Sequence, residues 1–303
     1  MADVLRLGTR GSALALAQAE LVAQALGARG VSVEVVTVRT AGDHSRSPSA
    51  PRLGSGIFVK ELEQALLGGH IDLAVHSAKD LPTTETAGVS VVAYLPRGDP
   101  RDALVSRIGR EVGDLPQGAV VGTESPRRTA FLLALRPDLR ITGLRGNVDT
   151  RLRRLDSGAL DAIVVAAAGL QRLGLAGRIT AVLSPEVMLP AVGQGAVAVQ
   201  VRTGGRSSAL AASLDHLPTR QELTAERAFL RAVGGGCRAP IAALARVDGG
   251  HLVLDGAVVS PDGRSVVRDR AVGAAEAAEE VGAALGARLL ARGAAALVGG
   301  GRA

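Results

Sequence analysis

The sequence has few aromatic residues and a single cysteine. Its 303 residues include one tyrosine, three phenylalanines and no tryptophan, too few rings for a surface that stacks nucleic-acid bases. One cysteine excludes an internal disulfide and is typical of a reducing compartment. No uninterrupted apolar run approaches the roughly 18 residues of a membrane span, and the N-terminus lacks a signal-peptide pattern. These absences predict a cytoplasmic protein that binds neither membrane nor nucleic acid.

Lysine is also scarce, although the chain is basic. The net charge is +6 and the isoelectric point about 10.7. Lys60 and Lys79 are the only lysines, so 33 of the 35 basic residues (35 minus 2) are arginines. Guanidinium groups bind carboxylates and phosphates, often through two hydrogen bonds. Small polyanions are therefore the expected partners. A nucleic-acid binder driven by net charge is the third and weakest alternative, because aromatic residues are so few.

The first two-thirds of the chain alternates short apolar runs with amphipathic helices. This pattern predicts an α/β fold with a mostly parallel sheet. The expected strands are 4–7, 31–38, 71–75, 119–121, 141–144 and 160–165, and the expected helices are 13–26, 57–67, 126–135 and 148–155. Residues 41–56, which are rich in Ser, Pro, Gly and Arg, predict a long loop.

Two pairs of short motifs indicate an internal repeat. Gly8-Thr9 matches Gly122-Thr123, and residues 69–72 match 158–161 as Gly, any residue, Ile or Leu, then Asp. We therefore expect two similar α/β domains that face each other across a cleft. The alternative is a chance likeness between two ordinary βαβ units.

The pattern changes after Pro218 to that of a small α+β domain. A helix is expected over 219–233, with Thr219 as its N-cap and Glu222 completing a capping box. A hairpin with strands 241–247 and 252–259, a third strand over 265–271 and an Ala-rich helix over 274–292 follow.

Cys237 lies on the first loop of this third domain. A lone cysteine is most often a small buried side chain. Three preceding glycines, however, leave little apolar surface to bury the thiol, and Arg238 favours its thiolate form. The sequence alone leaves both interpretations open.

Four polar clusters follow strands or begin helices, where open α/β sheets bind their ligands. They are Thr9–Ser12, His76–Asp80, Thr123–Arg128 and Arg145–Asn147, the last leading into the helix with Arg151. Each basic turn alone also fits a solvated helix end, and His76 alone fits a structural histidine. No second His or Cys lies at metal-ligand spacing, so no metal is expected. Together the clusters indicate one polyanionic ligand, with Asp80 as a candidate acid/base group.

Six motifs in order resemble the porphobilinogen deaminase family, whose members are also called hydroxymethylbilane synthases. The likeness runs from about Val4 to the last helix. The motifs are Thr9-Arg10-x-Ser12, Val75-His76-Ser77-x-Lys79-Asp80, Arg127-Arg128, Leu144-Arg145-Gly146-Asn147-Val148-x-Thr150-Arg151, Leu189-Pro190-Ala191-Val192-Gly193-Gln194-Gly195-Ala196 and Gly235-Gly236-Cys237.

The resemblance implies a transferase of tetrapyrrole and haem biosynthesis. Such an enzyme joins four porphobilinogen molecules head to tail with loss of ammonia and releases hydroxymethylbilane. Cys237 would carry a dipyrromethane cofactor through a thioether, and Asp80 would be the catalytic residue. A non-catalytic polyanion-binding protein of the periplasmic-binding type is the alternative.

The resemblance also implies site residues, because every pyrrole carries an acetate and a propionate. With Cys237, the cofactor-binding residues would be Ser12, Ser77, Lys79, Asp80, Arg127, Arg128 and Gly146. The substrate-binding residues would be Arg10, Ser12, Phe58, Arg145, Arg151, Arg172 and Gln194.

Two departures from the family pattern stand out. Arg52 and Ser55 replace two lysines of many relatives, and Glu124 replaces a residue that is usually uncharged. Glu124 either weakens anion binding or orients an arginine.

The implied architecture is a monomer of three domains. Two resemble periplasmic binding proteins, residues 1–99 with 196–214 and residues 100–195, and they flank the cleft. The small C-terminal α+β domain covers residues 218–303.

Overall fold

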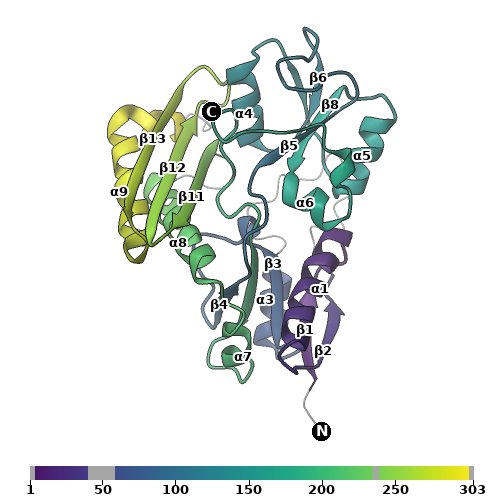
Figure 1. Ribbon diagram of the computed structural model, residues 1–303, viewed down its shortest axis with the longest axis vertical. Helices are drawn as coiled ribbons and strands as arrows, with labels where there is room; N and C mark the ends of the chain where they lie inside the picture. Colours follow the sequence, from purple (N-terminus) through teal and green to yellow (C-terminus); the bar gives the residue numbers. More distant parts are fainter. Residues whose placement is uncertain (1–3, 40–58, 235–238, 300–303) are drawn as a thin grey trace. The chain divides into compact units, whose positions relative to one another are not determined.

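The computed structural model describes residues 4–39, 59–234 and 239–299 (Figure 1). The chain divides into two compact units. One consists of residues 1–98 and 196–220, and the other of residues 99–195 and 221–303. Each unit has a five-stranded mixed sheet, and the second unit has a separate three-stranded sheet as well. The expected α/β class with a small additional C-terminal sheet is confirmed.

The sheet of the first unit has the order β2-β1-β3-β10-β4. Its strands are β1 (Leu5–Thr9), β2 (Val33–Thr37), β3 (Leu73–Ser77), β4 (Val89–Tyr94) and β10 (Val197–Arg202). The helices are α1 (Ala13–Gly27), α3 (Lys60–Leu67), the short 3₁₀ turn η1 (Ala78–Asp80) and α7 (Ser208–Ala212). β1 runs parallel to β2 and β3, whereas β10 is antiparallel to β3 and β4.

The larger sheet of the second unit has the order β7-β6-β8-β5-β9. Its strands are β5 (Asp102–Ser106), β6 (Val120–Gly122), β7 (Arg140–Thr142), β8 (Ala162–Ala166) and β9 (Ala181–Val182). The helices are α4 (Pro126–Leu135), α5 (Val148–Asp156), α6 (Ala167–Arg172) and η2 (Ala176–Arg178). β6 is parallel to β7 and β8, whereas β5 is antiparallel to β8 and β9.

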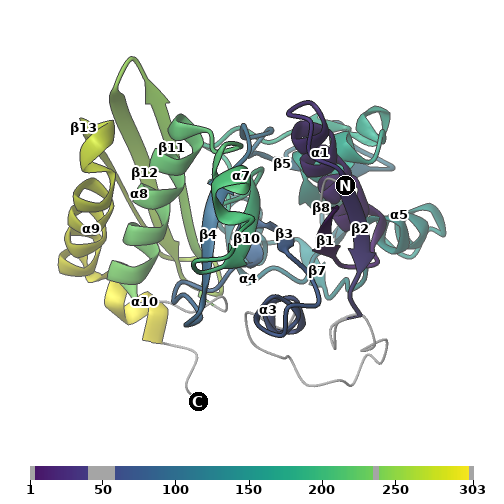
Figure 2. The same ribbon diagram turned by 90° about the horizontal axis from the view of Figure 1, so that it is seen from below.

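The three-stranded antiparallel sheet consists of β11 (Ile241–Asp248), β12 (His251–Val259) and β13 (Val266–Ala274). It is buried on both faces along most of β11 and β12, whereas β13 is largely exposed. Ala243 and Ala245 of β11 belong to the core with helices α8 (Leu217–Val233) and α9 (Ala278–Leu289), whereas Leu244 belongs to the core with α4. α8 and α9 lie side by side on one face (Figure 2), where Gly282 and Gly286 allow close approach. Neighbouring side chains of β11 therefore point into two different cores, as expected of a strand that is covered on both faces.

The internal repeat is confirmed by matching contacts in both five-stranded sheets. In the first, Asp72 Oδ2 accepts the backbone N–H of Arg6 at 2.9 Å. In the second, Asp161 Oδ2 accepts the N–H of Val120 at 2.8 Å. A side chain at Gly8 would collide with Ile71, and one at Gly122 would lie 2.8 Å from Leu160. The matched glycines therefore make room for the matched Ile and Leu side chains.

The expectation of mostly parallel sheets is confirmed, because β10 in one sheet and β5 in the other are antiparallel to their neighbours while the other four strands of each sheet share one direction. One expectation about a helix cap was wrong. Thr219 is not an N-cap, because α8 begins at Leu217. The Thr219 N–H donates to Nδ1 of His216 at 3.3 Å, so His216 caps this end. Glu222 accepts the N–H of Val247 at 3.3 Å.

The C-terminal helical segment covers nearly all of the helix expected over 274–292 and is kinked just beyond it. It comprises η3 (Ala275–Ala277), α9, a π-turn η4 (Leu290–Ala294) and α10 (Ala295–Gly299), and Gly293 has a φ of 95°. By length and a mean hydropathy of 1.4, residues 275–298 would suffice to cross a membrane. Leu285 and Leu289, however, are fully buried in the core with the three-stranded sheet. A core helix that packs on a sheet has the same composition.

Candidate active site

Asp80 lies on a tight turn at the carboxyl end of β3. The N–H of Ala78 donates to the carbonyl of Ala196 at 3.0 Å, and that of Leu81 donates to Ala78 at 3.2 Å. Ser77, Lys79 and Asp80 are partly exposed, whereas Ala78 between them is buried. The backbone thus anchors the turn to β10, while its polar side chains lie at the surface of the first unit.

Ser77 and Ser12 are each held by a hydrogen bond within the first unit. Gln18, buried on α1, donates to Ser77 Oγ at 2.8 Å and accepts from it at 3.1 Å. Ser12 is the N-cap of α1 and accepts the N–H of Ala15 at 3.3 Å. Arg10 precedes Ser12 on the same β1–α1 turn. The structure therefore fixes the hydroxyls of both predicted cofactor-binding serines.

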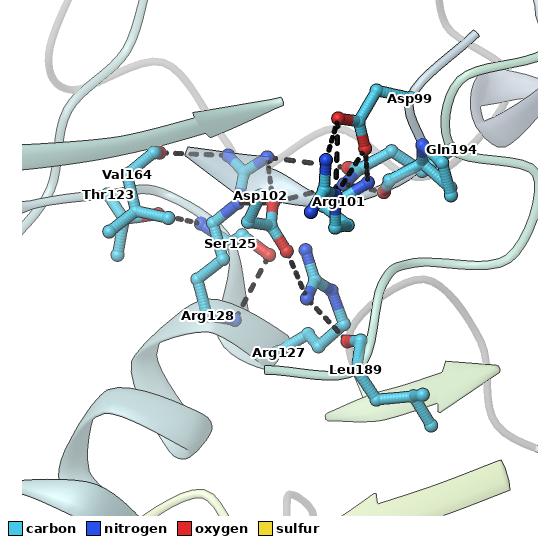
Figure 3. Close-up of polar contacts among 11 residues, drawn as sticks. Asp99, Arg101, Asp102, Thr123, Ser125, Arg127, Arg128, Val164, Leu189 and Gln194 are labelled. Atoms are coloured by element: carbon cyan, nitrogen blue, oxygen red, sulfur yellow. Dashed lines mark hydrogen bonds and ion pairs between the residues drawn. The ribbon is translucent and has the colours of Figure 1, made fainter. Parts of the chain in front are cut away.

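The second unit holds Arg127 and Arg128 in a buried cluster around Asp102 (Figure 3). The arginines are 4% and 6% exposed, and Asp102 is 0% exposed. Arg127 Nη1 lies 2.7 Å from Asp102 Oδ2, and Arg128 Nη2 lies 2.8 Å from Oδ1. Arg127 also donates to the carbonyl of Leu189 at 2.7 Å, and Arg128 to that of Val164 at 3.1 Å. α4 presents both arginines, because Ser125 caps it and Pro126 is its first residue.

Gln194 lies in the same cluster and is 1% exposed. Its Nε2 donates to the carbonyl of Pro100 at 2.8 Å and to Asp102 Oδ1 at 3.1 Å. Its Oε1 accepts from Arg128 at 3.4 Å. The predicted substrate-binding Gln194 thus has buried protein partners, and it contributes by holding Asp102 and Arg128 in place.

The cluster keeps one net positive charge, because two guanidinium groups face one carboxylate. Burial alone would raise the pKa of Asp102, but the charges of Arg127 and Arg128 outweigh it and hold that pKa well below its usual range. Burial lowers the pKa of Arg128. The buried Nε of Arg127 has no hydrogen-bond partner. A buried donor with an excess positive charge is suited to an anionic group such as a carboxylate.

Arg145, Gly146 and Arg151 lie around the N-terminus of α5. Arg145 Nε donates to Glu124 Oε1 at 3.2 Å, and both side chains are about one-third exposed. Gly146 has a φ of 104°, which side chains rarely adopt, and its carbonyl accepts from Arg151 at 2.8 Å. The arginine that Glu124 pairs with is Arg145, and this pairing fits both of its expected roles, orienting an arginine or competing with an anion for it.

Arg172 ends α6 and donates to the carbonyl of Gly195 at 2.5 Å. Burial lowers its pKa. Gly195 directly follows Gln194, so Arg172 and the Arg127 cluster hold the same segment of chain.

The loop predicted over 41–56 and seven residues named from the sequence lie outside the described residues. The seven are Arg52, Ser55, Phe58, Gly235, Gly236, Cys237 and Arg238. Among the described residues, no group of three or more His, Cys, Asp or Glu side chains could hold a metal ion.

Comparisons with known proteins agree with the sequence motifs. Residues 5–209 match the family model described as porphobilinogen deaminase, dipyromethane cofactor binding domain, and residues 220–291 match the porphobilinogen deaminase C-terminal domain. The chain belongs to the porphobilinogen deaminase family. Its first domain match is thus to a dipyrromethane cofactor-binding domain.

Relatives with this name cover nearly the whole chain. The porphobilinogen deaminase of Rubrobacter xylanophilus is 50% identical over 303 residues, covering 99% of this chain and 98% of that protein. The protein of Acidothermus cellulolyticus is 49% identical over 298 residues, covering 96% and 90%. The protein of Thermus thermophilus is 48% identical over 294 residues, covering 96% of each.

Similarity to solved structures is weaker. A periplasmic substrate-binding protein of an ABC transporter from Coxiella burnetii gives a TM-score of 0.45 at 18% identity, covering 71% of this chain and 93% of that chain. The BvgS periplasmic VFT2 domain of Bordetella pertussis gives 0.41 at 19% identity, covering 70% and 85%. Both TM-scores are below 0.5, and the strand orders of the two five-stranded sheets define the fold.

The sequence alone did not identify Asp102, Gln18 or Gln200 as residues of the site. Their buried side chains form hydrogen bonds to side chains of the family motifs. Asp102 follows Pro100-Arg101 at the start of an apolar run, and this was the one available signal. A carboxylate at the first position of a buried strand needs a cationic partner, and the chain offers two adjacent arginines. Periodicity could not show that β5 lies beside β8 and brings Asp102 to them.

Proposed function

We propose that this chain is a transferase that joins four porphobilinogen molecules head to tail and releases hydroxymethylbilane. Each addition forms one carbon–carbon bond and breaks the bond to the aminomethyl nitrogen, which leaves as ammonia, while the pyrrole carbon that forms the new bond loses its hydrogen as a proton. Water then cleaves the bond between the tetrapyrrole and the primer, and its hydroxyl becomes that of hydroxymethylbilane. The observation that carries the proposal is the match to both family domains along 5–209 and 220–291, with the Asp80 and Arg127-Arg128 motifs in place. A non-catalytic polyanion-binding protein is the less favoured reading.

Cys237 would anchor the dipyrromethane through its sulfur. When bound, this group supplies the primer to which pyrrole units are added. Arg127 and Arg128 would bind its carboxylates, since their cluster has a net positive charge and an unpartnered buried Nε. Ser12, Ser77, Lys79, Asp80 and Gly146 complete the proposed cofactor-binding set.

Asp80 would assist the reactions at the pyrrole and aminomethyl nitrogens of the substrate. Its carboxylate can stabilise positive charge on a pyrrole nitrogen and accept or donate a proton as the aminomethyl nitrogen departs. The turn suits this role, because its backbone is hydrogen-bonded at Ala78 while Asp80 stays partly exposed.

The remaining arginines would bind the acetate and propionate groups of the substrate and the growing chain. Arg145 and Arg151 are fixed around the start of α5, and Arg172 is fixed at Gly195. Arg10, Phe58 and Gln194 complete the proposed substrate-binding set, with Ser12 shared between the two. Three domains bounded at 99/100, 195/196 and near 218, a monomeric state and a cytoplasmic location also belong to the proposal.

An assay with porphobilinogen tests the proposed function. Purified protein should consume porphobilinogen, detected with Ehrlich's reagent, and should release one ammonia per porphobilinogen consumed. Asp80→Asn should keep the fold but lower turnover by on the order of 100-fold or more. A protein that binds porphobilinogen without releasing ammonia would instead be the polyanion-binding alternative. Full turnover by Asp80→Asn would remove Asp80 from its assigned role.

A further inference from the structure

A buried polar network in the first unit ties together the segments on both sides of the Asp80 turn. His76, on β3 four residues before Asp80, lies with Nε2 at 3.1 Å from Gln200 Oε1. Gln200, on β10, donates from Nε2 to Glu63 Oε1 at 2.9 Å. Glu63, on α3, accepts the hydroxyl of Thr86 at 2.8 Å. Thr86 follows Asp80 by six residues, so the network holds the chain before and after the turn.

The direction of each hydrogen bond in this network follows from its carboxylate. The Glu63 carboxylate accepts both from Thr86 and from the Gln200 amide nitrogen. Gln200 Oε1 is therefore the atom that faces His76, and it can only accept. His76 must then carry a proton on Nε2, which it donates to Gln200 Oε1.

The surroundings of His76 keep the ring neutral. The side chain is 5% exposed. Burial, assisted by the charge of Arg10, lowers the pKa of His76 to about 4 despite the hydrogen bond that His76 donates to Gln200. A neutral ring in a single tautomer gives the network one stable arrangement near pH 7.

We propose that His76 is a positioning residue, which through Gln200 and Glu63 fixes the Asp80 turn in the geometry needed for proton transfer. The proposal rests on the proposed function, because it takes Asp80 as the catalytic residue. His76 touches neither substrate nor cofactor in this account. Its part is to hold β3 and β10 in register where the turn leaves the sheet, as Val197↔Ser77 and Ala198↔His76 pair there.

Two substitutions of His76 by amide residues test whether the hydrogen bond to Gln200, rather than a polar side chain alone, is required. The amide nitrogen of a glutamine can take the place of His76 Nε2, whereas that of an asparagine reaches only the place of Nδ1. His76→Gln should keep kcat within about threefold of the native value, and His76→Asn should lower kcat by on the order of 10- to 100-fold, since a displacement of about 1 Å can cost this much. KM for porphobilinogen should change less than about twofold in both.

Ser207→Ala is the matched control. Ser207 is buried and donates to the carbonyl of Asp72 at 3.0 Å. Asp72 directly precedes the first residue of β3, at the end of the strand far from the Asp80 turn. This variant should lose stability like His76→Asn but keep its kcat. Equal kcat for His76→Asn and the native protein, with Asp80→Asn inactive, would overturn the positioning role alone. An active Asp80→Asn would instead overturn the proposed catalytic residue.

A spectroscopic measurement tests the network without any activity. In ¹⁵N-labelled protein at pH 7, the imidazole signal that disappears in His76→Gln should show the neutral tautomer protonated at Nε2. The same tautomer should persist down to about pH 5, because the pKa of His76 is lowered to about 4. A ring protonated at Nδ1, or charged at pH 6, would contradict the inferred network.

Discussion

The two five-stranded sheets share a strand order but carry different polar groups at corresponding strand ends. In the first sheet, Ser77 at the end of β3 pairs with Val197 of β10. In the second, Ala166 at the end of β8 pairs with Asp102 of β5. Ser77 thus corresponds to the apolar Ala166, and the apolar Val197 corresponds to the carboxylate Asp102. The same backbone frame presents a partly exposed carboxylate turn in one half and a buried cationic cluster in the other.

The difference shows how two sheets with the same strand order can carry two different chemical functions. The matched Gly and Asp contacts at the base of each sheet preserve the fold. The strand ends are where ligands bind in open α/β sheets, and there the halves diverge. The first half carries the group proposed for proton transfer, and the second carries the groups proposed to bind carboxylates.

The largest effect is expected from Asp102→Asn. The substitution leaves Arg127 and Arg128 buried without a counter-charge, which should lower the free energy of unfolding by about 3–5 kcal/mol. Urea unfolding monitored by circular dichroism measures the change. Asp99→Asn is the control, because Asp99 pairs with Arg101 at 2.7 Å and that arginine side chain is 45% exposed. This variant should lose less than about 1 kcal/mol. Equal losses in both would show that the cluster is not a buried charge system.

The buried His76 of the first sheet predicts that the free energy of unfolding depends on pH. Its pKa is about 4 in the folded protein and about 6.5 in the unfolded chain. The unfolded chain therefore binds more protons between these values, and stability falls as the pH is lowered from 6.5 to 4. The loss should be on the order of 2–3 kcal/mol. Urea midpoints across this range measure it, with His76→Gln as the reference. A slope that His76→Gln leaves unchanged would contradict the prediction.

Adding a methyl group to either matched glycine should affect the two sheets alike. Gly8→Ala would press on Ile71, and Gly122→Ala on Leu160 and Leu144, at 2.8 and 2.9 Å. Each should cost about 1–3 kcal/mol of unfolding free energy. Gly27→Ala, at the end of α1 with no atom within 4 Å, is the control and should not be destabilising. A large loss in one sheet only would break the proposed equivalence of the two frames.

The smallest effect is expected from Glu124→Gln. Removing this charge from beside Arg145 should lower KM for porphobilinogen by about two- to fivefold, because an exposed ion pair contributes about 0–1 kcal/mol. Initial rates at several salt concentrations measure it. Asp156→Asn removes a comparable exposed pair with Arg178, at 2.6 Å, and should leave KM unchanged. A higher KM in Glu124→Gln would show that orienting Arg145 outweighs competing for it.

Local signals predicted the elements that local chemistry decides. The helix over 126–135 was predicted with its observed bounds, because Ser125 and Pro126 mark its start. The repeat was visible because its Gly and Asp residues have structural roles in both halves. The positions of β5 and β10 were not predictable, since each pairs with strands distant in sequence. Asp102, Gln194 and Gln200 act through those pairings, so their roles required the fold.

The account depends most on Cys237 as the attachment point of a pyrrole primer. The intact mass of the native protein and of Cys237→Ser, both made in cells that synthesise porphobilinogen, tests this directly. The native protein should carry the added mass of two linked pyrrole units, and Cys237→Ser should have the mass of the bare chain. A bare native chain, or an adduct that persists on Cys237→Ser, would contradict the account.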